Sequence, residues 1–299
     1  PATLLFSTGY MANLAVLSTL AGRGDTIVAD KLNHASLLDG AKLSGAKLRR
    51  FAHGDLDAAR RQLQQAKGTR VLVTDAVFSM DGDCADLAGL NALAEEFDAW
   101  LVVDEAHSFG VLGDQGRGLF AQQALPVTKH VIRIGTLGKA FGTAGAFIAA
   151  EKQIIEILLQ SARPYLFTTA QPPAIAQATR CALNIIRQQP QLQTRLFAHV
   201  HRLRNGLTTL TQTHPSWSIM PSSTPIQPLV IGSAEQASKL AQALLTDGFL
   251  VPAIRPPTVP AGSSRLRFTL SAAHTEQQID ALLAAVEKQM EQVINPQLA

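Results

Sequence analysis

Short apolar runs alternate with amphipathic segments over the first half of the chain. Runs such as 71–73 and 101–103 show no alternation of apolar and polar positions, which is typical of strands covered on both faces. Helical periodicity separates the runs, for example over residues 55–65 and 86–97. This order predicts an α/β fold with a mostly parallel sheet flanked by helices. The predicted strands are residues 3–7, 26–29, 47–51, 71–74, 101–103, 131–134 and 144–149.

The second half of the chain shows a different order of elements. Two helices are predicted first, at residues 174–188 and 192–208, and Pro190 separates them. The elements after them are strands at 226–231, 249–254 and 266–270 and helices at 234–246 and 276–293. Thr275 and Gln278 form a capping-box pattern before the last helix. Its apolar face is formed by Ile279, Leu282, Leu283, Val286, Met290 and Val293. We therefore expect a large domain over residues 1–172 and a smaller α+β domain over residues 173–299, which includes the long connecting helices.

Composition narrows the function classes. The 299 residues include 26 basic and 23 acidic side chains that mix along the chain, so nothing points to nucleic acid or a membrane surface. No apolar run is long enough to span a bilayer. Cys84 and Cys181 lie far apart, which favours a reducing cytoplasm over a disulfide framework. The chain starts at Pro1 and runs at once into apolar residues, so we expect its own N-terminal segment to be missing.

Polar clusters fall where strands of the predicted sheet should end, at residues 7–10, 78–82, 104–107 and 136–139. Ligands bind at the carboxyl ends of such strands. The sequence Asp-Glu-Ala-His over 104–107 is similar to the magnesium-binding box of helicases, which also requires a phosphate-binding loop. The only candidate loop contains Gly138 and Lys139, but Arg133 and Ala140 occupy its essential glycine and Ser/Thr positions. The sequence thus argues against an NTPase, and we expect no metal site.

A pyridoxal 5'-phosphate (PLP) site explains the same residues better. This cofactor requires a lysine for a Schiff base and an acid beside its pyridine nitrogen. Asp104 follows a buried strand, where burial strengthens the pairing of a carboxylate with a pyridinium. Lys139 lies between Gly138 and Gly142, and glycines allow the backbone close to a flat cofactor. Without Asp104, Lys139 would be read as an ordinary loop lysine.

Several segments, in order, resemble the α-oxoamine synthases, a branch of the fold-type-I PLP enzymes. The matching segments are residues 7–13, 33–36, 77–83, 103–107, 136–140, 253–260 and 265–267. The resemblance implies a decarboxylative condensation of an amino acid with an acyl thioester. Segment 253–260 most resembles the branch that joins L-alanine to pimeloyl-CoA or pimeloyl-ACP in biotin biosynthesis. Glycine C-acetyltransferase and 5-aminolevulinate synthase types remain alternatives, as does a non-catalytic chain of this fold.

The resemblance also implies roles for individual residues around the cofactor. Lys139 would carry the Schiff base, Asp104 would pair with the pyridinium, and His107 would bond the phenolic oxygen. His34 would stack on the ring and meet the substrate, although a histidine early in a helix is also a common cap. The remaining implied cofactor contacts are Gly9, Tyr10, Ser79, Thr136, Thr168 and Thr169.

The resemblance places further residues at the substrate and at a subunit interface. Thr168 and Thr169 would contact the phosphate bound in a neighbouring subunit, which implies a homodimer with a shared active site; a simple polar turn is the alternative. Arg255 and Thr258 would face the substrate. Arg265 and Arg267 share a predicted strand and point to the same face, so either serves a substrate carboxylate or a structural ion pair.

Overall fold

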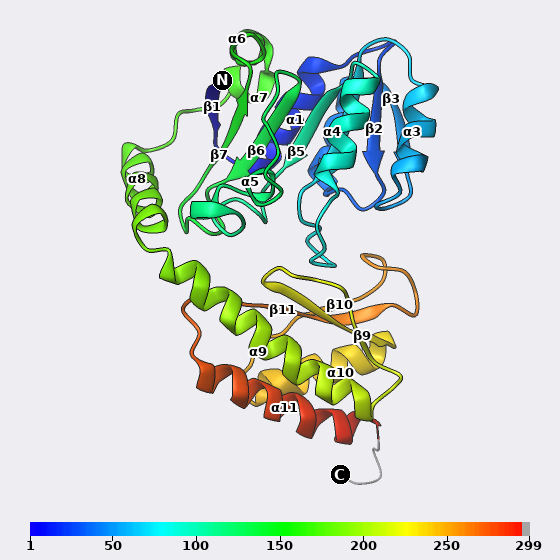
Figure 1. The fold of residues 1–299 in the computed structure, drawn as a ribbon, viewed down its shortest axis with the longest axis vertical. Helices are drawn as coiled ribbons and strands as arrows, with labels where there is room; N and C mark the ends of the chain where they lie inside the picture. The colour runs from blue at the N-terminus through cyan, green and yellow to red at the C-terminus, as the bar shows by residue number, and fades with distance from the viewer. Residues whose placement is uncertain (295–299) are drawn as a thin grey trace. The chain divides into compact units, whose positions relative to one another are not determined.

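The computed structural model describes residues 1–294, with side chains up to residue 290. Internal contacts divide the chain into two compact units (Figure 1). The first unit comprises Pro1–Phe78 and Cys84–Gln189, and the second comprises Ser79–Asp83 and the chain from Pro190 onward. We expected the division after residue 172, but the observed division lies one helix later, after Gln189. The reason is that α8 (Pro173–Gln188) packs against the short 3₁₀ helix η1 (Asp114–Gly116) of the first unit.

The first unit contains a seven-stranded sheet with the order β1-β7-β6-β5-β4-β2-β3. The pairs β3-β2, β2-β4, β4-β5 and β5-β6 are parallel, whereas β7 is antiparallel to both β1 and β6. The predicted mostly parallel sheet is confirmed. The strands are β1 (Ala2–Phe6), β2 (Thr26–Asp30), β3 (Lys47–Phe51), β4 (Arg70–Asp75), β5 (Trp100–Asp104), β6 (Val131–Thr136) and β7 (Ala146–Ala150).

Helices cover both faces of this sheet. In Figure 1, α1 (Gly9–Leu20) lies behind the sheet and α4 (Leu87–Glu96) lies in front of it. Helix α1 packs against α2, α6 and α7, and its alanine and leucine side chains are part of the core. The side chain of Thr8 accepts a hydrogen bond from the backbone of Met11 and so caps α1. The other helices are α2 (Ala35–Ser44), α3 (Leu56–Gln64), α5 (Leu119–Gln122), α6 (Lys152–Ser161) and α7 (Arg163–Leu166).

The second unit contains a four-stranded antiparallel sheet with the order β10-β11-β9-β8. Its strands are β8 (Ser218–Ile219), β9 (Ile226–Gly232), β10 (Ala253–Ile254) and β11 (Ser264–Thr269). Its helices are α9 (Gln191–Thr213), α10 (Ala234–Thr246) and α11 (Glu276–Ile294). The capping box is confirmed, because Thr275 and Gln278 exchange backbone-to-side-chain hydrogen bonds. The side chain of Val293, expected on the apolar face of α11, lies outside the described side chains.

Two sequence predictions for this sheet were incomplete. Strand β8 was not predicted. The predicted strand 249–254 is wrong over its first part, because only Ala253–Ile254 pairs with β11. The backbone N–H of Phe249 instead donates to the Leu244 carbonyl and closes the end of α10, and Pro252 has no N–H to donate.

Residues Ser79–Asp83 form the tip of a loop that leaves the first unit after β4 and belongs to the second. Val77 and Cys84 pair at the base of the loop. At the tip, the Gly82 carbonyl accepts hydrogen bonds from the hydroxyls of Ser222 (2.8 Å) and Thr224 (2.9 Å). Because buried hydroxyls hold a backbone carbonyl there, the tip is an integral part of the second unit.

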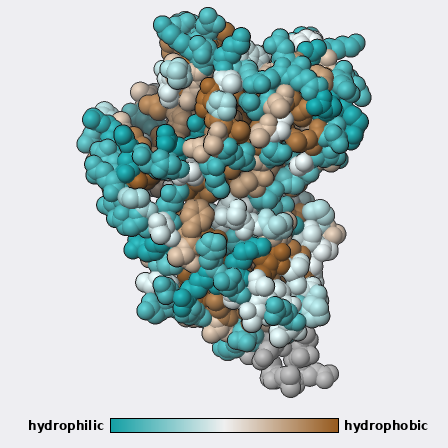
Figure 2. All heavy atoms as spheres, viewed as in Figure 1, coloured by the Kyte–Doolittle hydropathy of each residue, from teal (hydrophilic) through white to brown (hydrophobic). Residues whose placement is uncertain are grey.

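On the side shown in Figure 2, polar residues cover most of the surface and apolar residues form separate patches. Among the residues that the structure describes, no helix combines the length and the apolar character that a bilayer crossing requires.

Candidate active site

The carboxyl ends of β4 and β5 place two aspartates next to each other, since Asp75 and Asp104 are partners in the parallel register. Asp104 is only 4% exposed. Its Oδ2 accepts a hydrogen bond from Asn13 Nδ2 at 2.6 Å, and its Oδ1 accepts one from the Ala106 backbone at 2.9 Å. Hydrogen bonds to both oxygens fix the orientation of this carboxylate.

Asp75 is the second carboxyl group at these strand ends. Burial, and then the nearby charge of Asp104, raise the pKa of Asp75 well above its usual value. Its Oδ2 accepts a hydrogen bond from the His34 backbone at 2.6 Å, which acts in the opposite direction. The Asp75 carboxyl therefore keeps its proton to a higher pH than an exposed aspartate does.

His34 is the N-cap residue of α2, so the cap interpretation of this histidine is confirmed. Its Nδ1 lies 2.6 Å from Ser36 Oγ, which also accepts a hydrogen bond from Asn13 at 2.8 Å. The His34 ring meets the ring of Tyr10 edge to face, with centroids 6.5 Å apart. Asn13 on α1 thus joins Asp104 to the start of α2, which carries His34.

Lys139 lies in the tight connection between β6 and β7. Its backbone carbonyl accepts a hydrogen bond from Gly142, which has a φ of +62°. The Lys139 Nζ lies 2.9 Å from His107 Nε2. His107 comes three residues after Asp104. The segment at the end of β5 therefore contains both the Asp104 carboxylate and the histidine that contacts Lys139.

Gly9 and Thr136 meet at the first turn of α1. A Cβ atom at Gly9 would lie 2.5 Å from Thr136 Cγ2, so only glycine allows this approach. The buried Oγ1 of Thr136 has no hydrogen-bond partner among the described residues. An unpaired buried hydroxyl beside the N–H groups of a helix N-terminus is suited to an anionic group such as a phosphate. The site therefore fits a phosphate-bearing cofactor on an observation independent of the lysine.

The structure brings together most of the site residues expected in the first unit, but not all. Gly9, Tyr10, His34, Asp104, His107, Thr136 and Lys139 are linked by the contacts described above. Thr168 and Thr169 follow α7 in an exposed segment and join none of these contacts. Within the described residues, no group of three or more His, Cys, Asp or Glu side chains is arranged to hold a metal ion.

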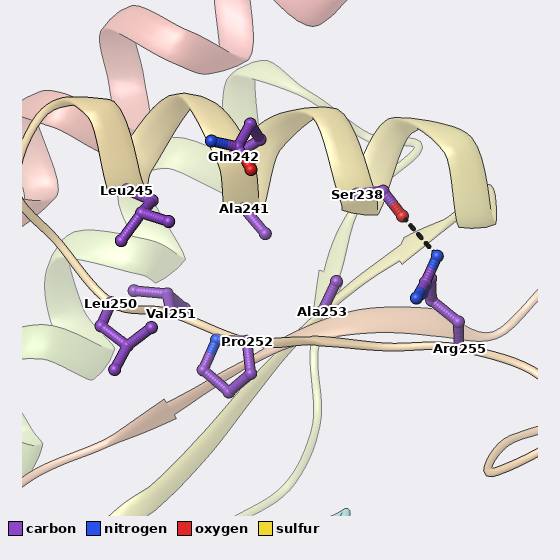
Figure 3. Close-up of a pocket in the computed structure, with 9 residues that line it drawn as sticks. All are labelled: Ser238, Ala241, Gln242, Leu245, Leu250, Val251, Pro252, Ala253 and Arg255. Carbon is purple, nitrogen blue, oxygen red and sulfur yellow. Dashed lines mark hydrogen bonds between the residues drawn. The ribbon is translucent and has the colours of Figure 1, made fainter.

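The remaining expected site residues belong to the second unit. The Ser79 carbonyl accepts a hydrogen bond from Arg267 Nε at 2.5 Å. Arg255 and Thr258 are exposed. Arg255 lines a groove of about 250 Å³ between α10 and the segment leading into β10. Figure 3 shows Leu245 and Leu250 at one end of this groove and, at the other, Arg255 donating to Ser238 Oγ at 3.2 Å.

Sequence reasoning assigned no role to Asn13, Asp75 or Glu105. Asn13 lay inside a quoted segment, but its partner Asp104 is 91 positions away. Asp75 directly follows the predicted strand 71–74, and its place at a strand end was the available signal. Glu105 was read only as part of the helicase-like tetrapeptide.

Comparison with known proteins defines the class of this site. The family model described as aminotransferase class I and II matches residues 1–286. A structure of serine palmitoyltransferase with PLP as an internal aldimine has a TM-score of 0.91 and 32% identity, covering 98% of this chain and 73% of that one. The match to the aminotransferase family and to a PLP enzyme structure rules out the NTPase interpretation.

Nearer relatives narrow the family. The 8-amino-7-oxononanoate synthase of Alkalilimnicola ehrlichii is 53% identical over 286 residues, which cover 95% of this chain and 72% of that protein. The 8-amino-7-oxononanoate synthase structure from Francisella tularensis has a TM-score of 0.83 and 34% identity, covering 97% of this chain and 83% of that one. The chain belongs to the aminotransferase class I and II family and, within it, to the 8-amino-7-oxononanoate synthases. The predicted membership of the α-oxoamine synthases is thereby confirmed.

Proposed function

We propose that this chain condenses L-alanine with a pimeloyl thioester, carried on coenzyme A or acyl carrier protein, in biotin biosynthesis. The products are 8-amino-7-oxononanoate, carbon dioxide and the free thiol. The observation that carries the proposal is the 2.9 Å approach of Lys139 Nζ to His107 Nε2, three residues after the buried Asp104 carboxylate, in a member of this family. A cytoplasmic location belongs to the proposal, and the wide separation of Cys84 and Cys181 in the sequence supports it.

PLP supplies an electron-accepting ring that stabilises negative charge on a substrate α-carbon. In the proposal, Lys139 binds it covalently, Asp104 faces its pyridine nitrogen and His107 its phenolic oxygen. Gly9, Tyr10 and Thr136 hold the phosphate at the N-terminus of α1. Ser79 and His34 also contact the cofactor, and His34 meets the substrate. Because burial and the nearby charge of Asp104 raise the pKa of Asp75, this second carboxyl group would add less negative charge beside the ring nitrogen.

Once the amino group of alanine has displaced it, the amine of Lys139 is the general base of the proposed reaction and removes the proton from the alanine α-carbon. The α-carbon then attacks the thioester carbonyl, and the thiolate leaves and takes up a proton. The alanine carboxyl group departs as carbon dioxide, and Lys139 returns its proton to the α-carbon. His107 beside the Lys139 nitrogen orients this amine and assists its proton transfers.

Arg267 is our choice for the amino-acid carboxylate among the three arginines left open by the sequence. Arg265 is almost fully buried and already pairs with Asp81. Arg255 donates to Ser238 in the groove beside α10. Burial lowers the pKa of Arg267, and no carboxylate among the described residues pairs with it. A half-buried guanidinium without a counter-ion is suited to a carboxylate ligand. Arg255 and Thr258 would then meet the acyl part of the substrate.

The proposal includes a homodimer with a shared active site. Helix α8 has no buried residue, although it carries apolar side chains such as Leu183 and Ile185 that are partly exposed. Phe167, next to Thr168, is 74% exposed. Apolar surface of this kind marks interfaces in soluble proteins. A second copy covering it would bring Thr168 and Thr169 to the phosphate of its neighbour. Sedimentation of the holoenzyme as a monomer would contradict this part.

The visible absorption spectrum tests the proposed chemistry. We expect purified protein with PLP to show a Schiff-base band that borohydride fixes onto Lys139 and that shifts with L-alanine more than with glycine. Turnover of paired amino acids and thioesters then separates this reaction from the glycine- and serine-dependent rivals. A band without turnover of any pair would favour the non-catalytic alternative. Absence of the band in folded protein, including a form extended to the length of the relatives, would contradict the cofactor assignment.

A further inference from the structure

Glu105 is the most deeply buried charged residue beside the site, and the proposed reaction gives it no task. It directly follows Asp104 and is 1% exposed. Its Oε1 accepts a hydrogen bond from Arg133 Nε at 2.6 Å. Its Oε2 accepts hydrogen bonds from Ser108 Oγ at 2.8 Å and from the Leu119 backbone at 2.9 Å. A buried carboxylate is strongly disfavoured unless charge and hydrogen bonds compensate for lost solvent, and here both oxygens are paired.

The loop that follows β5 is built around this carboxylate. Gly118 has a φ of +90°, and a Cβ atom there would lie 1.7 Å from Glu105 Oε2. Only glycine therefore allows the chain to pass over the carboxylate. Arg133 closes the same loop, because its Nη2 donates to the Arg117 carbonyl at 2.7 Å and its guanidinium lies 5.2 Å from the Phe120 ring centroid.

Each member of this ion pair is close in sequence to one of the two residues that meet in the site, His107 and Lys139. His107 lies two residues after Glu105. Arg133 lies on β6, the strand that leads to Lys139. The Glu105 N–H also donates to the Ile134 carbonyl at 2.7 Å, and its own carbonyl accepts the Ser108 N–H at 3.0 Å. The turn that presents His107 is thus held to β6 by backbone and side-chain bonds together.

We propose that the Glu105–Arg133 ion pair is a positioning device that holds His107 against the Lys139 nitrogen. Removal of the charge on Glu105 loosens the turn around His107 and changes the proton affinity of Lys139. The effect passes through His107, so Glu105 itself touches neither substrate nor cofactor. The inference rests on the proposed function, because that function gives the Lys139 nitrogen its chemical task.

Glu105→Gln is the sharpest test, because it keeps the size of the side chain and an oxygen for Ser108 or Leu119 while removing the charge that Arg133 pairs with. In the holoenzyme we expect the pH midpoint of the visible band to move by about half a pH unit or more. We expect kcat to fall about tenfold, because the Lys139 amine would no longer be held in its reactive position. The matched control is Glu96→Gln, which removes an exposed ion pair with Arg60 in the same unit and should change neither.

A second readout does not depend on the cofactor. In apoprotein, the rate at which acetic anhydride labels Lys139 as a function of pH reports the proton affinity of its amine. Exposed Lys152 on α6 serves as the internal reference. We expect the labelling midpoint of Lys139 to shift in Glu105→Gln while that of Lys152 stays constant. If wild-type protein with PLP shows no Schiff-base band, the proposed function fails. The labelling of Lys139 by acetic anhydride still tests the role of the Glu105–Arg133 ion pair in that case.

A purely structural role gives a different result. Glu105→Gln would then lower the melting temperature but leave both midpoints within about a tenth of a pH unit of wild type, and the proposal would be overturned. Should Glu105→Gln fail to fold, Arg133→Lys keeps a positive charge near Glu105 but cannot donate to both Glu105 and the Arg117 carbonyl, so it weakens the pair. We expect a smaller shift in the same two midpoints for that variant, and no shift would again overturn the proposal.

Discussion

Replacement of Gly82 by alanine tests the loop tip that the second unit holds. Gly82 has a φ of +74°, a conformation that costs a residue with a side chain about 1 kcal/mol. Its Cβ would also lie 2.3 Å from the Ile226 carbonyl oxygen and 2.7 Å from Ser222 Oγ. The tip would have to withdraw, and the Gly82 carbonyl would lose its bonds to the Ser222 and Thr224 hydroxyls, each worth about 1 kcal/mol. The expected loss for Gly82→Ala is thus about 3 kcal/mol.

Gly262→Ala is the matched control for backbone strain. Gly262 lies in the same unit with a φ of +78°, and a Cβ there meets nothing within 4 Å. Its expected cost is therefore only the strain, about 1 kcal/mol. Urea unfolding can be followed by the fluorescence of Trp217, which is 3% exposed in the second unit, in a Trp100→Phe background that removes the other tryptophan. Equal free energies of unfolding for the two alanine variants would refute the docking of the tip.

Three further predictions concern the site itself. The raised pKa of Asp75 means that the folded state holds a proton that the unfolded state releases above about pH 4. Stability is therefore lost as pH rises from that value towards the folded pKa, and Asp75→Asn should remove the loss. Melting temperatures across this range check it, and a difference from wild type that does not change with pH would contradict it. Lys139→Ala should fold but show no turnover, and near-wild-type turnover would sink its assignment. Arg267→Lys should raise the KM for alanine about tenfold or more and that for the thioester far less, because lysine cannot make the paired contact; equal effects on both would contradict the choice of Arg267.

Local signals predicted much of the fold. Strands such as β4 and β5 are runs of branched apolar residues that need no partner to be recognised. Strand β8 contains only Ser218 and Ile219, too short for any periodic pattern. Helix α8 was correctly expected as a helix, yet nothing in its sequence shows that it groups with the first unit. That grouping depends on η1, which lies about 60 residues earlier.

The site shows the same limit. Lys139 and Asp104 were found because each ends or follows a strand and carries unusual local sequence. The partners that hold the site lie far away in the chain: Asn13 is 91 positions from Asp104, and Asp81 is 184 positions from Arg265. Such pairs depend on sheet order and register, which short-range patterns do not specify. Glu105 was misleading for another reason, since its contacts depend on a glycine 13 residues further on, at Gly118.

The pairing of β1 with β7 has a consequence for synthesis of the protein. Ala2 is the register partner of Ala150, so β1 leaves the ribosome long before the strand it pairs with. At about 5–20 residues per second, the delay is roughly seven to thirty seconds. During this interval the apolar side chains of Leu4 and Phe6, buried in the finished sheet, have no partner strand. The nascent chain therefore presents these apolar side chains to holdase chaperones until β7 is made.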